Sequence, residues 1–132
     1  MENSVLDSYA VLAFLFREPG YEKVLKLLEE ATIADQTAFM ASPNWAEVYY
    51  QVERKLGSTK WQEVRSKLLG LPIEVLAVDR DLAESAAALK VTKKMSLVDC
   101  FCAAVAKEQK AAVYTGEPEF KAVEREIKIV WI

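Results

Sequence analysis

Residues 96–120, SLVDCFCAAVAKEQKAAVYTGEPEF, contain a helix, a strand and an acidic turn in direct succession. Small and apolar side chains recur at helical spacing in residues 96–110, which predicts a helix. Residues 111–115, AAVYT, form a short apolar run bounded by a glycine, which predicts a buried strand. The turn that follows carries two glutamates around a proline, Glu117 and Glu119. A helix, then a buried strand, then a polar turn is the order typical of an α/β protein.

The rest of the chain repeats this alternation of strands and helices. Further apolar runs predict strands, and stretches with a helical apolar period predict helices. Such alternation, with β-branched strands, predicts an α/β fold with a mainly parallel central sheet of about five strands and helices on both faces. In such a sheet, binding sites lie beyond the carboxyl ends of the strands. The remaining predicted strands are residues 4–7, 37–41, 73–78 and 127–132, and the remaining predicted helices are residues 8–18, 21–31, 44–57, 58–70 and 81–90.

Two of the predicted helices have a well-defined apolar face. We expect these faces to pack against the rest of the fold, because an amphipathic helix buries its apolar stripe. The stripe of the helix over residues 21–31 consists of Val24, Leu27, Leu28 and Ala31, and that of the helix over residues 44–57 consists of Trp45, Val48, Tyr49, Val52 and Leu56.

The composition indicates one folded domain. The chain has 132 residues, of which 52% are hydrophobic and 28% charged, and no linker-like stretch or internal repeat divides it, so we expect a single domain over residues 1–132. No apolar run reaches the roughly 18 residues that span a bilayer, and the N-terminus lacks the features of a signal peptide. Cys100 and Cys102 lie about 200° apart around the predicted helix, which suits neither a disulfide nor a shared metal. We therefore expect a reduced, cytoplasmic protein.

The charged residues restrict the possible chemistry. A net charge of −3 gives no broad basic face for nucleic acid, although it is compatible with a local basic patch. The chain contains no histidine. This excludes nucleophilic catalysis by a Ser-His or Cys-His pair and removes the commonest zinc ligand. Any chemistry must therefore use carboxylates, hydroxyls, lysines or a hard metal ion.

Two carboxylates interrupt apolar segments that contain no lysine or arginine. Asp7 is the only charged residue in residues 5–16, and Asp99 is the only one in residues 96–106. A carboxylate among apolar side chains is unfavourable unless a positive charge compensates it. Because neither segment supplies that charge, we expect it to come from elsewhere.

Two glutamates occupy comparable places in the chain. Glu47 opens a predicted helix, and Glu117 directly follows a predicted strand. All four acids lie at the carboxyl end of a strand or in the first turn of a helix, and these places meet at one edge of a parallel sheet. Carboxylates without histidine are the ligand set that Mg²⁺ and Mn²⁺ prefer. The sequence therefore predicts a metal site formed by Asp7, Glu47, Asp99 and Glu117.

Helix capping is the structural alternative for two of these acids. Ser96-x-x-Asp99 fits a capping box, and Asn44-x-x-Glu47 is a variant with Asn as the cap. Each cap stabilises a helix by about 1 kcal/mol. Capping explains each acid singly, whereas a metal site also explains why one acid falls at each strand edge, and we favour the metal site.

Three segments in this order resemble the PIN-domain ribonucleases and, within them, the VapC toxins of toxin–antitoxin pairs: VLDSYAVLAFLFREPG, SPNWAEVYYQV and SLVDCFCAAVAKEQKAAVYTGEPEFKAVE. The resemblance covers nearly the whole chain and implies a PIN-like fold. It places the four acids of the family on Asp7, Glu47, Asp99 and Glu117. The TxDxxF loop of the family is TGEPEF here, so Glu replaces Asp at the fourth position. Glu119 is expected to face solvent.

The resemblance implies a metal-dependent endoribonuclease. Asp7 and Asp99 would hold Mg²⁺ or Mn²⁺ directly, and Glu47 would be a ligand or orient the attacking water. In-line attack on an RNA phosphodiester would leave 5′-phosphate and 3′-hydroxyl ends. Ser96 and Thr115 are expected to hydrogen-bond the carboxylates and fix their rotamers. The lysines best placed to contact RNA phosphates are Lys93, Lys94 and Lys121.

The resemblance also implies protein partners. VapC-type toxins form homodimers and are silenced by a VapB-type antitoxin, which lays a segment along an apolar groove and often inserts an arginine into the acidic pocket. Residues 9–16, YAVLAFLF, and residues 24–28, VLKLL, carry more apolar surface than one core face needs. These helices are candidates for lining such a groove, and plain core packing is the alternative.

Two other functions compete with the nuclease. A catalytically weak PIN-like module that binds RNA or protein is favoured by the replacement of Asp by Glu117. A phosphotransferase of the haloacid-dehalogenase kind also places an Asp after its first strand, but it needs a second Asp two residues later. That position is Tyr9 here, so the phosphotransferase is set aside.

Overall fold

The computed structural model describes residues 1–132 and contains five strands, six α-helices and one 3₁₀ helix. Strands and helices alternate along the chain, as the apolar periods predicted. The elements are β1 (Ser4–Leu6), α1 (Ser8–Phe16), α2 (Tyr21–Ile33), β2 (Ala38–Ala41), α3 (Ser42–Leu56), α4 (Ser58–Leu69), β3 (Ile73–Leu76), α5 (Arg80–Thr92), α6 (Leu97–Gln109), β4 (Ala112–Thr115), η1 (Pro118–Val123) and β5 (Ile129–Trp131).

The five strands form one sheet in the order β3-β2-β1-β4-β5, and every neighbouring pair is parallel. This confirms the predicted parallel α/β fold. Strand β1 is central, since Val5 pairs with Phe39 of β2 on one side and with Val113 of β4 on the other. Strands β2 and β3 are added in turn on one side of β1, and the chain then crosses over to form β4 on the other side of β1. The order therefore reverses between β1 and β4, which is where α/β sheets form their binding crevices.

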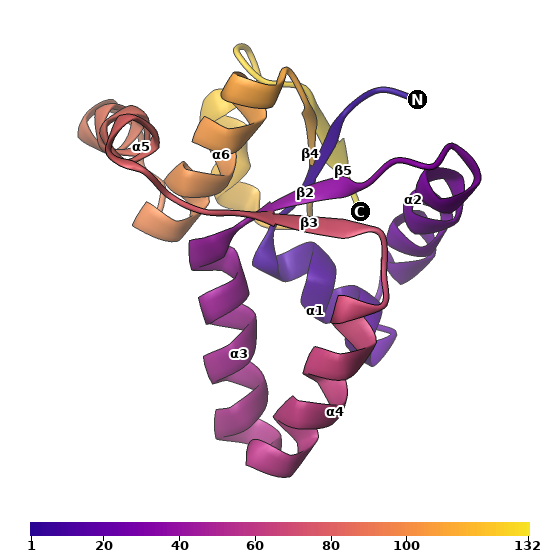
Figure 1. Cartoon of the computed structure of the whole chain (residues 1–132). Coiled ribbons are helices and arrows are strands. Elements are labelled where there is room, and N and C mark those ends of the chain that lie inside the picture. The colour runs from indigo at the N-terminus through magenta and orange to yellow at the C-terminus, as the bar shows by residue number, and fades with distance from the viewer.

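Helices cover both faces of the sheet (Figure 1). Helices α5 and α6 lie on one side of it, and α1, α3 and α4 lie on the other. Each side of the sheet has its own apolar core. One core has 17 buried residues and includes most of the apolar side of α6, and the other has 13 and includes most of the buried apolar side chains of α1 to α4. This two-layered burial explains why the strands are apolar on both sides.

The apolar face expected for α2 is confirmed, and that expected for α3 is only partly correct. Val24, Leu27, Leu28 and Ala31 of α2 are all buried. In α3, Val48 and Val52 are buried, but Tyr49 is 41% exposed and Leu56 is 50% exposed. Tyr49 instead stacks on Trp61 of α4, with 4.6 Å between ring centroids. The stripe is therefore divided between the core, the neighbouring helix and the surface.

The N-terminus of α3 differs from the prediction. The helix begins at Ser42, and its N-cap is Ala41, which has no capping side chain. Asn44 is consequently inside the first turn and fully buried, and its Nδ2 donates a hydrogen bond of 3.0 Å to Ser8 Oγ. The prediction that Asn44 caps this helix is wrong. Pro43 favours the first helical turn, so the helix starts earlier than the polar side chain suggested.

The acidic turn after β4 continues into a short helix that the sequence pattern did not predict. Residues Pro118–Val123 form η1, whose N-cap is Glu117. Phe120 is fully buried, as is Val123, and these two side chains anchor the turn to the core. Both cysteines are buried and free. None of the helices combines the length and apolar character of a membrane span.

Candidate metal centre

Asp7 directly follows the central strand and caps helix α1. It is 1% exposed, and its Oδ1 accepts the Ala10 N–H at 2.8 Å. Its Oδ2 accepts a hydrogen bond from the Thr115 hydroxyl at the end of β4. Burial raises the pKa of the Asp7 carboxyl to about 7, the bonds from Thr115 and Ala10 lower it, and the charges of Glu117 and Glu47 raise it. The carboxyl therefore lacks a compensating cation within the chain.

Asp99 lies in the first turn of α6 and is 9% exposed. Ser96 is the N-cap, and its hydroxyl accepts the Asp99 N–H at 3.2 Å. Burial raises the pKa of the Asp99 carboxyl to about 7; hydrogen bonding with Glu119 and the charge of Asp7 raise it as well, while a bond from Ser96 lowers it. Because the charge of Asp7 acts on Asp99, the two acids share one electrostatic environment.

The two glutamates of the predicted set lie at the rim of this environment. Glu47 is half-buried in α3, and its Oε2 accepts a hydrogen bond of 3.3 Å from the Tyr50 hydroxyl. Glu117 is half-buried after β4, where its N–H donates to Thr115 Oγ1 at 2.8 Å. Its Oε1 accepts the Glu119 N–H at 3.2 Å, so this carboxylate also caps η1. The single hydroxyl of Thr115 therefore contacts both Asp7 and the acidic turn.

Glu119 was expected to face solvent and is exposed, but its carboxylate also has a partner that the sequence interpretation did not predict. Its Oε1 accepts the Ser96 N–H at 2.7 Å, which ties the acidic turn to the N-terminus of α6. The side chain therefore lies at the site although the residue is largely exposed. Pro118 was the available signal, because proline favours the first position of a helical turn. The helical turn places the Glu119 side chain near Asp99. In an extended loop, the same side chain could point into solvent.

All five acids line one hollow of about 270 Å³ at the carboxyl edge of the sheet. No lysine or arginine lines it. The structure thus brings together the four predicted residues and adds a fifth, and these residues are Asp7, Glu47, Asp99, Glu117 and Glu119.

The donor chemistry of this hollow fits a hard divalent cation. The available ligands are carboxylate and hydroxyl oxygens, which Mg²⁺ and Mn²⁺ prefer. The raised pKa values of Asp7 and Asp99 arise from buried negative charge, which a bound cation would stabilise. No three of these acids are yet arranged so that they could hold one ion together. Coordination therefore requires side-chain rotations from the positions that the carboxylates occupy here.

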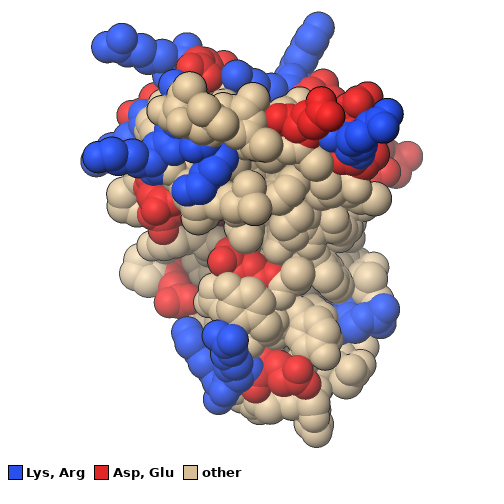
Figure 2. Space-filling view, turned by 90° about the vertical axis from the view of Figure 1, so that its left-hand side faces the viewer, with Lys and Arg blue, Asp and Glu red and all other residues tan.

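None of the predicted RNA-binding lysines lines the hollow. Lys93 forms an ion pair of 2.9 Å with Glu126, while Lys94 and Lys121 are exposed. Figure 2 shows the face of the molecule where α3, α5 and α6 lie, with acidic side chains at its centre and Lys and Arg side chains above and below them. The centre of this face is therefore acidic, and its two ends carry both basic and acidic side chains.

Known proteins resemble this chain in sequence pattern and in fold. The sequence model of the PIN domain family matches residues 4–126. The structure of VapBC from Salmonella typhimurium bound to DNA matches with a TM-score of 0.78 at 18% identity, over 99% of this chain and 98% of that chain. VapBC2 from Rickettsia felis, bound to a promoter DNA fragment, matches with a TM-score of 0.75 at 17% identity, over 97% of each chain.

A third solved structure adds a relative whose substrate is stated. Mycobacterium tuberculosis VapC20, a toxin that cleaves the sarcin–ricin loop, matches with a TM-score of 0.71 at 18% identity, over 92% of this chain and 95% of that chain. No curated protein matches this chain. At such identities the solved structures show a shared fold, and the family model covers nearly all of the sequence. The chain therefore belongs to the PIN domain family.

Proposed function

We propose that this protein is a Mg²⁺- or Mn²⁺-dependent endoribonuclease and acts as a VapC-type toxin. The observation that carries the proposal is the hollow lined by five carboxylates, two of them buried with pKa values raised to about 7, without a basic side chain among its lining residues. Such a site is costly for the folded protein unless a cation binds there. The fold and the cleavage of RNA by VapC20 support the same reaction.

The chain's own residues would position the reacting groups. Thr115 and the Ala10 N–H hold both oxygens of Asp7, and the helix start at Ser96 holds Asp99. Glu47 stands at the rim, where its carboxylate can accept a hydrogen bond from the attacking water and orient it for in-line attack. Expulsion of the 3′-oxygen would leave 3′-hydroxyl and 5′-phosphate ends.

Asp7 and Asp99 would hold the metal ion, with Glu47 and Glu117 as further ligands. When bound, the ion would lower the pKa of water and neutralise charge on the phosphate. Because the acidic centre repels RNA, basic residues at its rim are needed for binding, and Lys94 and Lys121 are the exposed candidates. Lys93 is a further candidate if RNA displaces Glu126 from its ion pair.

The decisive experiment compares RNA cleavage by the wild type and by Asp99→Asn, each with Mg²⁺, Mn²⁺ or EDTA. We expect cleavage only by the wild type with metal. Asp81→Asn is the matched control, because Asp81 is an exposed acid in the first turn of α5. Equal and EDTA-insensitive cleavage by the wild type and Asp99→Asn would refute the metal mechanism.

A catalytically weak PIN-like module that binds RNA or protein is the second candidate. It is favoured by the capping bond that Glu117 makes to the Glu119 N–H, because that bond occupies one carboxylate oxygen. The two candidates differ in their response to Asp7→Asn. A nuclease loses Mn²⁺-dependent cleavage on this substitution, whereas a binding module retains RNA binding and shows the same residual cleavage as the wild type.

Two partners belong to the proposal. A VapB-type antitoxin is proposed because similar folds were solved as VapBC complexes, and a homodimer is proposed from the resemblance to VapC toxins.

Expression of the wild type without an antitoxin should arrest cell growth, whereas expression of Asp99→Asn should not. Light scattering of the purified chain should give twice the mass of one chain, and a monomer at micromolar concentration would contradict the homodimer.

A further inference from the structure

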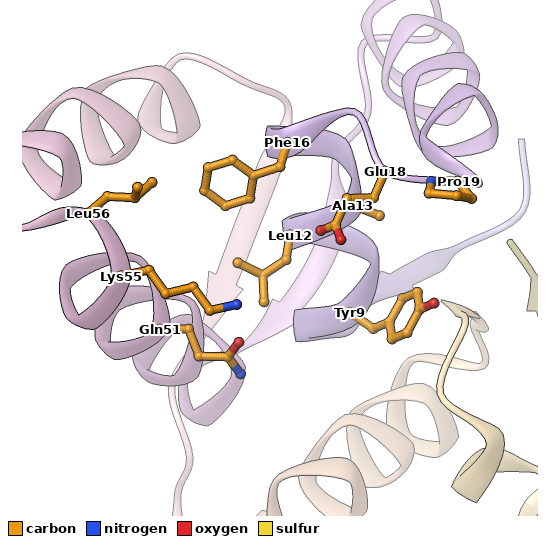
Figure 3. Close-up of a pocket in the computed structure, with 9 residues that line it drawn as sticks. All are labelled: Tyr9, Leu12, Ala13, Phe16, Glu18, Pro19, Gln51, Lys55 and Leu56. Carbon is orange, nitrogen blue, oxygen red and sulfur yellow. The ribbon is translucent and has the colours of Figure 1, made fainter.

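A second hollow adjoins the acidic one. It has a volume of about 570 Å³ and lies between helices α1 and α3 (Figure 3). Three residues line both hollows, and these are Tyr9, Leu12 and Gln51. The two hollows are therefore neighbours, and we call the three shared residues the junction strip. A strand bound at the carboxylates would meet this strip before the wider, more apolar hollow.

The position of Tyr9 is fixed by the acidic turn. A methyl group placed on Gly116 would lie only 2.3 Å from Tyr9 Cε1 and 2.6 Å from its Cζ, so the ring packs directly on that glycine. The ring is nevertheless 45% exposed. In Figure 3, Tyr9 points from α1 toward the segment after β4. An exposed aromatic ring is thus held in place beside the loop that carries Glu117.

Three side chains on one face of helix α3 change from negative to neutral to positive from the acidic hollow to the wider one. Glu47, Gln51 and Lys55 are four residues apart, so they lie on one face of the helix, about 6 Å from one to the next. Glu47 lines the acidic hollow, Gln51 the junction strip, and Lys55 the wider hollow. The row therefore runs from a carboxylate through an amide to an ammonium group. Figure 3 shows Gln51 and Lys55 directed toward α1.

We propose that the junction strip binds one nucleobase of a single-stranded RNA, next to the phosphate that is cleaved, and selects that base. The inference rests on the proposed ribonuclease function and deepens it. The Tyr9 ring supplies a stacking surface, and the Gln51 amide hydrogen-bonds the edge of the base. The Lys55 ammonium contacts a phosphate further along the strand. Aromatic stacking with base-edge hydrogen bonds is how proteins read unpaired RNA.

The order of side chains along α3 favours RNA over a peptide in this place. Along α3, a carboxylate that would hold the scissile phosphate through a cation is followed by an uncharged amide and then by a lysine about 12 Å further along. This order suits a phosphate at each end of the row and a base between them. An apolar peptide would make no use of the amide and ammonium groups. A base in a duplex cannot reach the strip, so the substrate is single-stranded or has an unstacked base.

The test is a thermodynamic cycle between Tyr9 and the base. The probe is a labelled single-stranded RNA whose cleaved bond has been mapped, together with the same RNA carrying an abasic nucleotide at the position beside that bond. Binding is measured by fluorescence anisotropy and cleavage by initial rates. We expect Tyr9→Leu to weaken binding of the intact RNA by about fivefold to a hundredfold, and to leave binding of the abasic RNA unchanged. Tyr9→Phe should bind like the wild type.

Gln51→Leu should reduce the discrimination between the four bases at that position, with a change in KM and little change in kcat. Gln62→Ala is the matched control, because Gln62 is exposed on α4.

The proposal is overturned if Tyr9→Leu weakens binding of the intact and the abasic RNA equally, or if it weakens binding of neither. Loss of antitoxin binding with unchanged RNA binding would also overturn it and assign the strip to the protein partner. Absence of metal-dependent cleavage by the wild type would instead refute the proposed function. The role of the strip would then be decided by binding alone, with the abasic nucleotide placed at each position of the RNA in turn.

Discussion

At Thr115, a single hydroxyl joins the central sheet to the acidic turn. It donates to Asp7 Oδ2 and accepts the Glu117 N–H at 2.8 Å. Thr115→Val removes both bonds with almost no change in volume. We expect the free energy of unfolding to fall by about 1–3 kcal/mol, because a buried carboxylate loses a donor. Mn²⁺ affinity should fall by about tenfold or more, because the Asp7 rotamer is no longer held.

Calorimetric titration with Mn²⁺ and urea unfolding would check both effects. Thr92→Val is the control, since Thr92 is exposed at the end of α5. Unchanged Mn²⁺ affinity in Thr115→Val would show that this hydroxyl supports the fold alone.

The two glutamates of the acidic turn have different partners, so their substitutions should have different effects. The charge of Glu117 acts on Asp7, whereas Glu119 acts on Asp99 and accepts the Ser96 N–H. Glu119→Ala should destabilise the fold by about 1 kcal/mol, because a helix N-terminus loses its acceptor. Glu119→Gln retains an acceptor oxygen and should cost less.

Glu117→Gln should mainly lower metal affinity, because it removes charge beside Asp7. Urea unfolding and Mn²⁺ titration of the three variants would separate the two roles. The assignment fails if Glu117→Gln matches the wild type in cleavage rate and metal affinity, because Glu117 would then serve only as a cap.

Helices α1 and α3 are joined by a buried polar contact between Ser8 and Asn44. Asn44 Nδ2 donates to Ser8 Oγ at 3.0 Å, and Ser8 Oγ donates to the Asn44 carbonyl at 3.3 Å. Asn44→Leu leaves the Ser8 hydroxyl without its side-chain partner and should lower the free energy of unfolding by about 1–3 kcal/mol. In the double variant Ser8→Ala/Asn44→Leu both polar side chains are absent. Its free energy of unfolding should therefore fall by less than the sum of the falls in the two single variants.

The measurement is the free energy of unfolding of the two single variants and the double variant. Additive losses would contradict the coupling. Because Ser8 follows Asp7 and Asn44 lies one turn before Glu47, this contact also sets the distance between two helix starts that carry acids of the site.

The packing of Tyr9 on Gly116 is a second contact between elements. The backbone of Gly116 needs no positive φ, so the glycine is required for space alone. Gly116→Ala would drive a methyl group into the Tyr9 ring and should destabilise the fold by about 1–3 kcal/mol. Tyr9→Ala in the same chain should restore part of that loss, because it removes the obstructing ring. Thermal unfolding of the single and double variants tests this prediction. A Gly116→Ala variant as stable as the wild type would contradict the close packing.

The stability of the whole molecule should depend on pH in opposite ways with and without metal. The pKa values of Asp7 and Asp99 are raised from 3.8 to about 7, so the folded state holds protons that the unfolded chain releases between pH 4 and 7. The contribution of these two groups to stability is therefore fully present near pH 4 and is lost as the pH rises through 7. A bound cation favours the ionised carboxylates, so stabilisation by Mn²⁺ should be larger at pH 8 than at pH 5.5.

Thermal unfolding at both pH values, with Mn²⁺ or EDTA, would measure this difference. The double variant Asp7→Asn/Asp99→Asn should remove the Mn²⁺ effect and most of the difference between the two pH values that the wild type shows. Equal stabilisation by Mn²⁺ at pH 5.5 and 8 would contradict the assignment of these acids as the metal-binding pair.

Local pattern was sufficient for the element order and for part of the site. The apolar periods predicted the strands and helices, with ends displaced by one to a few residues, because helix starts depend on side-chain competition that the period does not contain. At α3, Pro43 outweighed Asn44, and the buried partner Ser8 made the early start favourable. The acids Asp7 and Asp99 were recognisable because each is the only charge in an apolar segment.

The sequence by itself determined the parallel α/β class, the absence of histidine chemistry and the four acids expected at one sheet edge, since these follow from residue type and period. Only the tertiary structure decided that Glu119 joins them, that Asp7 is held by Thr115, and that Tyr9, Leu12 and Gln51 line two neighbouring hollows. The physical reason is the crossover from β3 to β4, which brings the last third of the chain beside β1. Contacts made across that crossover leave no periodic trace in the sequence.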